Sequence, residues 1–371
     1  MNDLIPPLLS DGQIMAEVNG CLGLITLNRP QALNALSLAM VRDLTTLLRH
    51  WQAHEQVKAV VVLGAGRPGK APAFCAGGDI RFFHQAAHAG DAALEDFFTE
   101  EYRLNHLIHA YPKPYIALMD GIVMGGGMGI SQGAKLRVLT EQSRLAMPET
   151  AIGLFPDVGG GWFLAQCPGH VGEWLALTGE TIGAGDAIEW GLGDVYVRSE
   201  QMPGLIAALR SEPQPSAEHV VATVMERVDL APASAPKTAT DRIHRHFGQP
   251  TLGAILASLA SSDDDWARQT HAALLKRSPT MMAVTLELVR RGRTLSLADD
   301  LRLERDLVHH CFHLRGAARS ETVEGIRALA VDKDHAPRWQ PASVEAIDAA
   351  EVQAFFASPW AAQEHPLKEL V

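Results

Sequence analysis

The sequence predicts an α/β protein with a repeated ββα core and a helical C-terminal region. Between residues 14 and 192, short apolar runs alternate with amphipathic segments in the order strand, strand, helix. This order recurs at spacings of about 35 to 50 residues, which suits a repeated supersecondary unit. Beyond residue 198 the periodic segments are helical. We therefore expect a core at residues 1–198, followed by a junction and a helical region at residues 199–371.

The first repeat is expected to begin with two strands within residues 14–27 that meet around Asn19 and Gly20. Asn-Gly is a hairpin signal because both residues accept positive φ angles. Ser37 is then expected to cap an amphipathic helix that ends near His54, since its hydroxyl can accept from the first backbone amides.

The later repeats follow the same order. A buried strand is expected at residues 58–64, because β-branched residues fill that segment. A glycine-containing loop, GRPGKAPAFCAGGDI, then leads to an acid-rich amphipathic helix at residues 91–110. Further strands are expected at residues 114–121, 135–140 and 144–147, and helices at 160–167, 171–178 and 184–190.

The region after the core changes in composition. Residues 199–265 are polar and punctuated by proline, as expected for a junction with short helices. Ser278 and Pro279 predict the start of a helix, because proline suits the first helical position. Ser296 predicts the start of another helix, over residues 297–313, with Asp299 three residues later as a capping partner.

Composition excludes several classes of partner. The net charge of −11 argues against nucleic acid, because phosphate binding relies on clustered Lys and Arg. No uncharged apolar run reaches the ~18 residues that a membrane span needs, and the N-terminus lacks the basic segment of a signal peptide. Four widely spaced cysteines without a CxxC pair favour reduced thiols. We expect a cytoplasmic protein that binds neither membrane nor nucleic acid; a homo-oligomer is left open.

A glycine triplet and two acids suggest a reactive site. Gly125, Gly126 and Gly127 follow an apolar run, so no side chain shields their amides from a ligand. If a helix begins there, its first amides can hold an oxyanion that develops during acyl chemistry. Glu149 and Asp157 follow in apolar or glycine-rich settings, which favours an acyl-transfer site. The alternative is a glycine hinge with two helix caps.

Five motifs in the core resemble the enoyl-CoA hydratase/isomerase (crotonase) superfamily: LNRPQALNALS, FCAGGDI, MDGIVMGGGMGI, PETAIGLFPDVGGGW and ALTGETI. Within that superfamily the sequence most resembles the 3-hydroxyisobutyryl-CoA hydrolases, through EEYRLN, PETAIGLFPDVGGG, SPTMMAVTLELVRRG and EGIRALAVDKDHAPRW. The likeness covers most of the chain and is weakest in residues 199–265. It implies a crotonase-like spiral in which residues 1–198 bind an acyl-CoA thioester.

The resemblance also implies roles for single residues. The amides of Gly78 and Gly126 match the positions that hold the thioester oxygen in an oxyanion hole. Glu149 matches a catalytic acid or base. Asp157 stands where hydratases usually carry glycine and the hydrolases carry aspartate. Gly129 stands where hydratases place a second glutamate, so its identity counts against hydration, which needs an acid and a base on one water.

Glu101 matches a substrate-binding glutamate of the hydrolase branch, with a solvated helix face as the alternative. Asp157 could instead cap a helix that begins near Gly161. Cys75 has no histidine partner in its motif and is expected in the core.

Three histidines near the end of the last long helix include a pair four residues apart. No carboxylate-rich segment accompanies them, so we expect a surface face and no metal site. The residues are His309, His310 and His313.

The expected activity is hydrolysis of a short-chain 3-hydroxyacyl-CoA thioester. By resemblance this is 3-hydroxyisobutyryl-CoA, cleaved to 3-hydroxyisobutyrate and CoA in valine catabolism. No cofactor is expected, since CoA is part of the substrate, and Arg29, Lys333 and Arg338 are candidate partners of its phosphates. The alternatives are an enoyl-CoA hydratase or isomerase of the same fold, or a non-catalytic acyl-CoA-binding protein.

Overall fold

The computed structural model describes residues 4–211, 213–234 and 237–371. They form two compact units, each assembled from three segments of the chain. Unit 1 comprises Met1–Gly78, Arg103–Leu145 and Ile182–Ser234, and unit 2 comprises Asp79–Tyr102, Ala146–Thr181 and Ala235–Val371. Because both units are discontinuous in sequence, they do not test the expected division between residues 198 and 199, which stays a prediction.

The predicted α/β class with a repeated ββα core is confirmed. The strands are β1 (Ile14–Asn19), β2 (Leu22–Leu27), β3 (Ala59–Gly64), β4 (Ala73–Cys75), β5 (Tyr115–Met119), β6 (Ile122–Met124), β7 (Leu136–Leu139), β8 (Arg144–Ala146) and β9 (Val195–Tyr196). The helices of the core are α1 (Leu38–Ala53), α2 (Ile80–Ala89), α3 (Ala93–His109), α4 (Gly126–Gln132), α5 (Gly160–Ala165), α6 (Val171–Thr178) and α7 (Ala184–Glu189).

The elements named beyond residue 198 are helical, as expected. They are α8 (Met202–Ser211), α9 (Ala217–Met225), α10 (Lys237–Phe247), α11 (Leu252–Ala260), α12 (Asp265–Leu274), α13 (Pro279–Gly292), α14 (Leu297–His313), α15 (Glu321–Ile326) and α16 (Ala349–Phe355), with short 3₁₀ and π turns between some of them. The side chains of Ser278 and Ser296 cap α13 and α14, as the sequence predicts.

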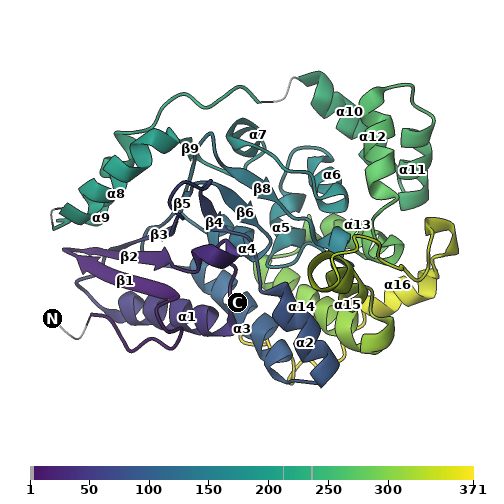
Figure 1. The fold of residues 1–371 in the computed structure, drawn as a ribbon, viewed down its shortest axis with the longest axis horizontal. Coiled ribbons are helices and arrows are strands. Elements are labelled where there is room, and N and C mark those ends of the chain that lie inside the picture. The colour runs from purple at the N-terminus through teal and green to yellow at the C-terminus, as the bar shows by residue number, and fades with distance from the viewer. Residues whose placement is uncertain (1–3, 212, 235–236) are drawn as a thin grey trace. The chain divides into compact units, whose positions relative to one another are not determined.

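The repeat explains the two sheets (Figure 1). In the units that begin with β3, β5 and β7, the first strand enters a large sheet with the order β1-β2-β3-β5-β7-β9, and the second enters a small sheet with the order β4-β6-β8. In the first unit, β1 and β2 both lie in the large sheet. Strands β2, β3, β5, β7 and β9 run parallel, whereas β1 pairs antiparallel with β2. The glycine-rich loops that follow β4 and β6 therefore leave neighbouring strands of the same sheet.

The hairpin between β1 and β2 differs by one residue from the prediction. Asn19 remains in β1 and pairs with Leu22, so the two loop residues are Gly20 and Cys21. Gly20 has a φ of +61°, the sign that the first position of a II′ turn requires.

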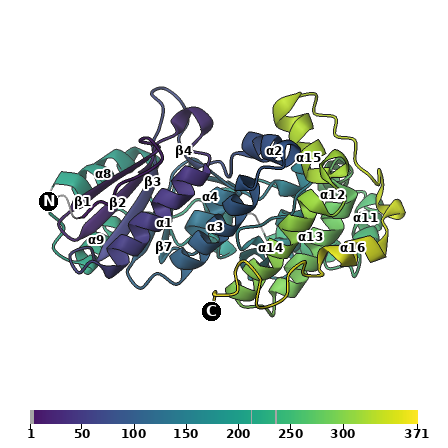
Figure 2. The same ribbon diagram turned by 90° about the horizontal axis from the view of Figure 1, so that it is seen from below.

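Helices cover both faces of the large sheet in unit 1. Side chains two residues apart on β2, β3 and β5, such as Val61 and Leu63, form one buried cluster with Leu205 and Leu209 of α8 and Val220 of α9. On the other face, α1 runs beside β1 to β3 (Figure 2), and the Trp51 ring packs against Gly23 of β2. The polar segment after residue 198 thus supplies two helices to the core sheet.

Helix α2 is an addition to the elements expected from the sequence. Its start has a local signal, because the Asp79 side chain accepts a hydrogen bond from the Phe82 amide. Phe83 and Ala86 are its buried residues. In the described part of the chain, no helix combines the length and apolar character needed to cross a membrane. The four cysteines, all described, are buried and form no disulfide.

We predict that Gly127→Ala destabilises the protein by about 1–3 kcal/mol, the usual cost of overpacking. A methyl group on Gly127 would overlap the backbone oxygen of Cys75, which cannot move without disturbing β4. The matched control is Gly66→Ala, because a methyl group there meets nothing within 4 Å. Urea unfolding of both variants tests this, and equal stabilities would contradict it.

Candidate active site

Three of the acids predicted from the sequence are buried in unit 2. Glu101 lies on α3, Glu149 begins the 3₁₀ turn Glu149–Ile152, and Asp157 lies in the loop before α5. Their exposed fractions are only 2%, 6% and 5%. Such burial is unusual for carboxylates without cationic partners. It contradicts the alternative in which Glu101 is on a solvated helix face.

These acids perturb one another, which shows that the structure brings them together. Burial raises the pKa of Glu101 well above its ordinary value, and the negative charges of Asp157 and Glu149 raise it further. Burial and then the charge of Asp157 likewise raise the pKa of Glu149. Burial raises the pKa of Asp157 to about 6. Groups with ordinary pKa values near 4 are thus shifted toward neutrality, as catalytic acids and bases often are.

Tyr102 is a site residue that the sequence reasoning missed. Its buried hydroxyl donates a hydrogen bond of 2.8 Å to Asp157 Oδ2, and this bond opposes the effect of burial on the pKa of Asp157. Tyr102 follows Glu101 in the chain, but the two partners are 55 residues apart and no local pattern links them.

The alternative of Asp157 as a helix cap is contradicted. Gly159 is the N-cap residue of α5, and no side chain caps that position locally. Instead, the Gly159 and Gly161 amides donate to the two carboxylate oxygens of Glu304, at 2.7 and 3.0 Å. The Trp162 amide donates to Asp300 Oδ2 at 2.9 Å. Side chains of α14 therefore cap α5, and the Asp157 side chain accepts a hydrogen bond from Tyr102 instead.

Two carboxylate oxygens remain for other partners. Glu101 Oε1 and Glu149 Oε2 are buried and make no hydrogen bond with the described residues. A hydrogen bond from its own backbone amide, the first amide of the 3₁₀ turn, opposes the rise in the pKa of Glu149, so Glu149 as a cap stays an alternative. Buried polar atoms without partners are costly, and a substrate or water can satisfy them.

Unit 1 brings the two predicted oxyanion donors to adjacent loops. Gly78 follows β4, Gly126 begins α4 directly after β6, and β4 and β6 pair in parallel. A methyl group built on Gly77 would lie 3.6 Å from the Gly126 nitrogen, which shows how closely these loops approach. Gly77 has a φ of +105°, a conformation that favours glycine. Gly126 is the first residue of α4, so its amide has no acceptor one turn earlier within the helix.

The remaining candidates fall into different settings. Cys75 is fully buried in β4, as expected for a core thiol. Gly129 is buried in α4. Arg29 donates to the Ala35 carbonyl oxygen at 3.1 Å, and Lys333 is exposed.

Arg338 lines a cavity of about 660 Å³ within unit 2. Lys276 and Arg277 line the same cavity, which gives it three basic side chains. Ala151, from the 3₁₀ turn that begins at Glu149, forms part of its wall. Positive charge in a concave site suits a phosphate-bearing ligand.

Comparison with known proteins finds close relatives. The 3-hydroxyisobutyryl-CoA hydrolase, mitochondrial, of Xenopus tropicalis is 39% identical over 355 residues, covering 94% of this chain and 90% of the relative. The protein of the same name from Homo sapiens is 38% identical over 352 residues, covering 93% and 89%.

Two solved structures share the fold. One is described as a carnitinyl-CoA dehydratase from Mycobacterium thermoresistibile, with a TM-score of 0.87 and 36% identity over 96% of this chain and 99% of that chain. The other is described as an enoyl-CoA hydratase from Rhodobacter sphaeroides 2.4.1, with a TM-score of 0.82 and 38% identity over 94% and 98%. A family model described as enoyl-CoA hydratase/isomerase matches residues 22–356. The chain therefore belongs to the enoyl-CoA hydratase/isomerase family.

Proposed function

We propose that the protein hydrolyses 3-hydroxyisobutyryl-CoA to 3-hydroxyisobutyrate and coenzyme A. The observation that carries the proposal is the acid pair of unit 2, in which Asp157 is buried, bound by Tyr102 and electrostatically coupled to Glu149. The hydrolase name borne by relatives that are 37–39% identical supports the same substrate. Valine catabolism is the pathway that this substrate implies by resemblance.

The competing function is hydration or dehydration of an acyl-CoA, because the two solved relatives carry dehydratase and hydratase names. Hydration needs two groups that act on one water, an acid and a base. The position at which hydratases of this superfamily place their second glutamate is Gly129, a residue without a titratable group. Asp157 occupies the hydrolase-type position instead, so we favour thioester cleavage.

In the proposed reaction, the Gly78 and Gly126 amides hold the thioester oxygen as negative charge develops on it. Glu149 either takes a proton from the attacking water or attacks the carbonyl carbon itself, giving an anhydride that water then cleaves. The carbon–sulfur bond breaks, and the departing thiolate takes up a proton. Asp157 orients the water or supplies that proton.

The electrostatics of unit 2 suit these roles. A carboxylate whose pKa is raised is a stronger base once it is ionised, and base catalysis is most effective when the pKa lies near the working pH. Burial and the charge of Asp157 raise the pKa of Glu149 in this direction. Because the charges of Glu149 and Asp157 interact, loss of a proton from one makes loss of a proton from the other less favourable.

Substrate binding is proposed to involve Glu101 and the basic cavity. Glu101 Oε1 lacks a partner among the described residues and, when protonated, can exchange hydrogen bonds with a substrate hydroxyl. Arg338, Lys276 and Arg277 in the cavity would receive CoA phosphates. This chemistry requires no resident cofactor or metal. A cytoplasmic location stays a prediction, since the relatives named above are called mitochondrial.

We predict that the protein releases free thiol faster from 3-hydroxyisobutyryl-CoA than from acetyl-CoA. The rate should persist in chelator, because carboxylates supply the acid and base. A thiol-reactive dye measures release, and ultraviolet absorbance of crotonyl-CoA measures hydration in parallel. Dominant hydration of crotonyl-CoA, or loss of thiol release in chelator, would overturn the proposed function.

Glu149→Gln should lower kcat by at least about 10²-fold, the usual contribution of a positioned acid or base. Substrate affinity should change little, because most CoA contacts lie elsewhere along the ligand. Glu200→Gln is the control, since that side chain is 74% exposed in its weak ion pair with Arg198. Near-normal turnover in Glu149→Gln would show that the site is wrongly assigned.

Asp157→Asn should stabilise the protein at pH 7 by roughly 1–3 kcal/mol while lowering kcat. The folded pKa of Asp157 is about 6 against an ordinary 3.8, so the folded state binds the proton more tightly. Stability therefore falls as pH rises between these values, and the deficit persists above pH 6. Asparagine cannot ionise and should flatten this part of the profile. Unfolding curves at several pH values test it.

The matched control for this prediction is Asp265→Asn, because the Asp265 side chain is 81% exposed. It should leave both turnover and the pH profile of stability near those of the wild-type protein. An Asp157→Asn variant that keeps full activity would contradict the role of Asp157, and an unchanged pH profile would contradict its raised pKa.

A further inference from the structure

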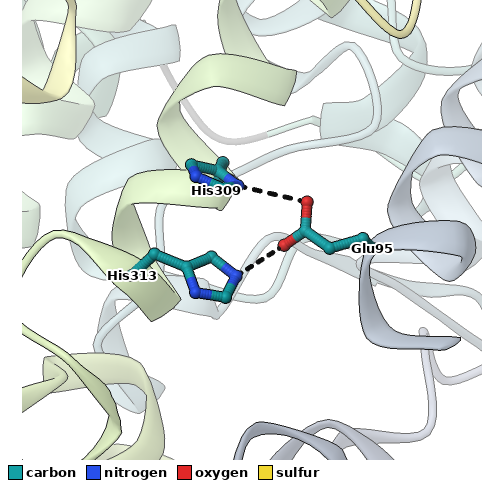
Figure 3. Close-up of side chains that lie close together, drawn as sticks. All are labelled: Glu95, His309 and His313. Atoms are coloured by element: carbon teal, nitrogen blue, oxygen red, sulfur yellow. Dashed lines mark hydrogen bonds and ion pairs between the residues drawn. The ribbon is translucent and has the colours of Figure 1, made fainter. Parts of the chain in front are cut away.

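A second cluster of titratable side chains lies outside the three acids described above (Figure 3). Glu95 is in the first turns of α3, and His309 and His313 are one turn apart near the end of α14. Glu95 Oε1 lies 2.8 Å from His313 Nε2, and Glu95 Oε2 lies 3.2 Å from His309 Nδ1. All three residues belong to unit 2. The expectation of a bare surface face rested on the lack of a carboxylate, and the fold supplies one from 214 residues away.

The donor set matches a borderline transition metal. Two imidazole nitrogens and one carboxylate oxygen are ligands that Zn²⁺ prefers. With bonds of 2.0–2.1 Å, tetrahedral zinc holds its ligand atoms about 3.3 Å apart. One ligand atom from each residue can be chosen so that all three lie within 4.8 Å of one another. Over the described ranges, this is the only group of three or more His, Cys, Asp or Glu residues so arranged.

The contacts of Glu95 also suit a metal ligand. Its two carboxylate oxygens face different neighbours, with His309 and Arg305 at Oε2 and His313 at Oε1. Arg305 contacts Oε2, which leaves Oε1, the oxygen nearer His313, to face a cation.

Arg305 has two opposing effects on such a site. A hydrogen-bonded neighbour fixes the orientation of a metal-binding carboxylate, which favours binding. Its positive charge repels a cation, so the affinity should be lower than that of a closed four-ligand site. The His313 side chain is 49% exposed, which provides a route for the metal.

We propose that Glu95, His309 and His313 bind one divalent transition-metal ion of the zinc class, with water in the remaining position. The ion joins α3 to α14. Six residues further along α3, about 9 Å at the usual helical rise, lies Glu101, and α14 also carries Glu304. The ion is thus a clamp between two helices that support the acids, and it takes no part in the proposed thioester cleavage.

The test compares chelator-treated protein with protein that is supplied with zinc at about 100 times the Kd for zinc. Zinc should raise the melting temperature of the protein by about 2–5 °C, and calorimetry should give one ion per chain. His313→Ala and Glu95→Gln should each weaken zinc binding at least about tenfold and abolish the rise in melting temperature. His313 is half-exposed, so its variant should fold even if Glu95→Gln does not.

Two controls separate this site from adventitious zinc binding. His310 is adjacent on α14 but bonds the Ala357 carbonyl oxygen at 2.7 Å. His84 and His88 form another pair four residues apart, with ring centroids 4.6 Å apart, and belong to no three-ligand group among the described residues. His310→Ala and His84→Ala should keep the zinc response.

A cluster held only by the contacts between Glu95 and the two histidines would give no zinc-dependent change, and that result overturns the proposal. So does a response that survives in His313→Ala, because the ion then binds elsewhere. Loss of the response in His84→Ala also counts against the proposed site. As a measurement independent of melting, Co²⁺ should give visible absorption bands in the wild-type protein that are absent in His313→Ala.

Discussion

Glu101, Glu149 and Asp157 are removed from water in the same compact unit, and no lysine or arginine pairs with them in the contacts described. Removing an ionised carboxylate from water costs several kcal/mol unless it is paired or protonated. Burial raises the pKa of each carboxyl, which favours its neutral form, and the Tyr102 hydroxyl stabilises Asp157 by donating to it. The pKa values of Glu101 and Glu149 therefore depend on whether Asp157 is ionised.

Keeping Asp157 in this position requires a rigid loop, and the loop is held by more acids. Glu304 accepts hydrogen bonds from the Gly159 and Gly161 amides, and Asp300 accepts one from the Trp162 amide. Burial raises the pKa of both carboxyls, to about 7 for Asp300. Glycine at 161 fits this packing, because a methyl group there would lie too close to Asp300 Oδ1 and would displace that side chain. The burial of Asp300 and Glu304 is therefore unfavourable in itself, but their hydrogen bonds order the backbone at the start of α5.

The parts of the fold that were predictable depend on neighbours in sequence. Ser37 caps α1 through the amide three residues later, and the alternation of strands and helices follows from local periodicity. The acids Glu149 and Asp157 were found by motif. The Tyr102–Asp157 bond joins residues 55 apart and the Glu304–Gly159 bond residues 145 apart, so no local pattern specifies them. Glu95 was overlooked beside the histidines for the same reason.

The solved relatives named dehydratase and hydratase share the fold of this chain, so the fold alone does not decide which reaction is catalysed. The resemblance assigns the second hydratase acid to the position of Gly129, in unit 1, whereas Asp157 lies in unit 2. An acid at one position or the other therefore changes which unit bears the cost of burying it. In this chain that cost falls on unit 2, where Tyr102 and α14 provide the supporting hydrogen bonds. An acid introduced at Gly129 would be buried within α4 and would need hydrogen-bond partners there to offset the cost of its burial.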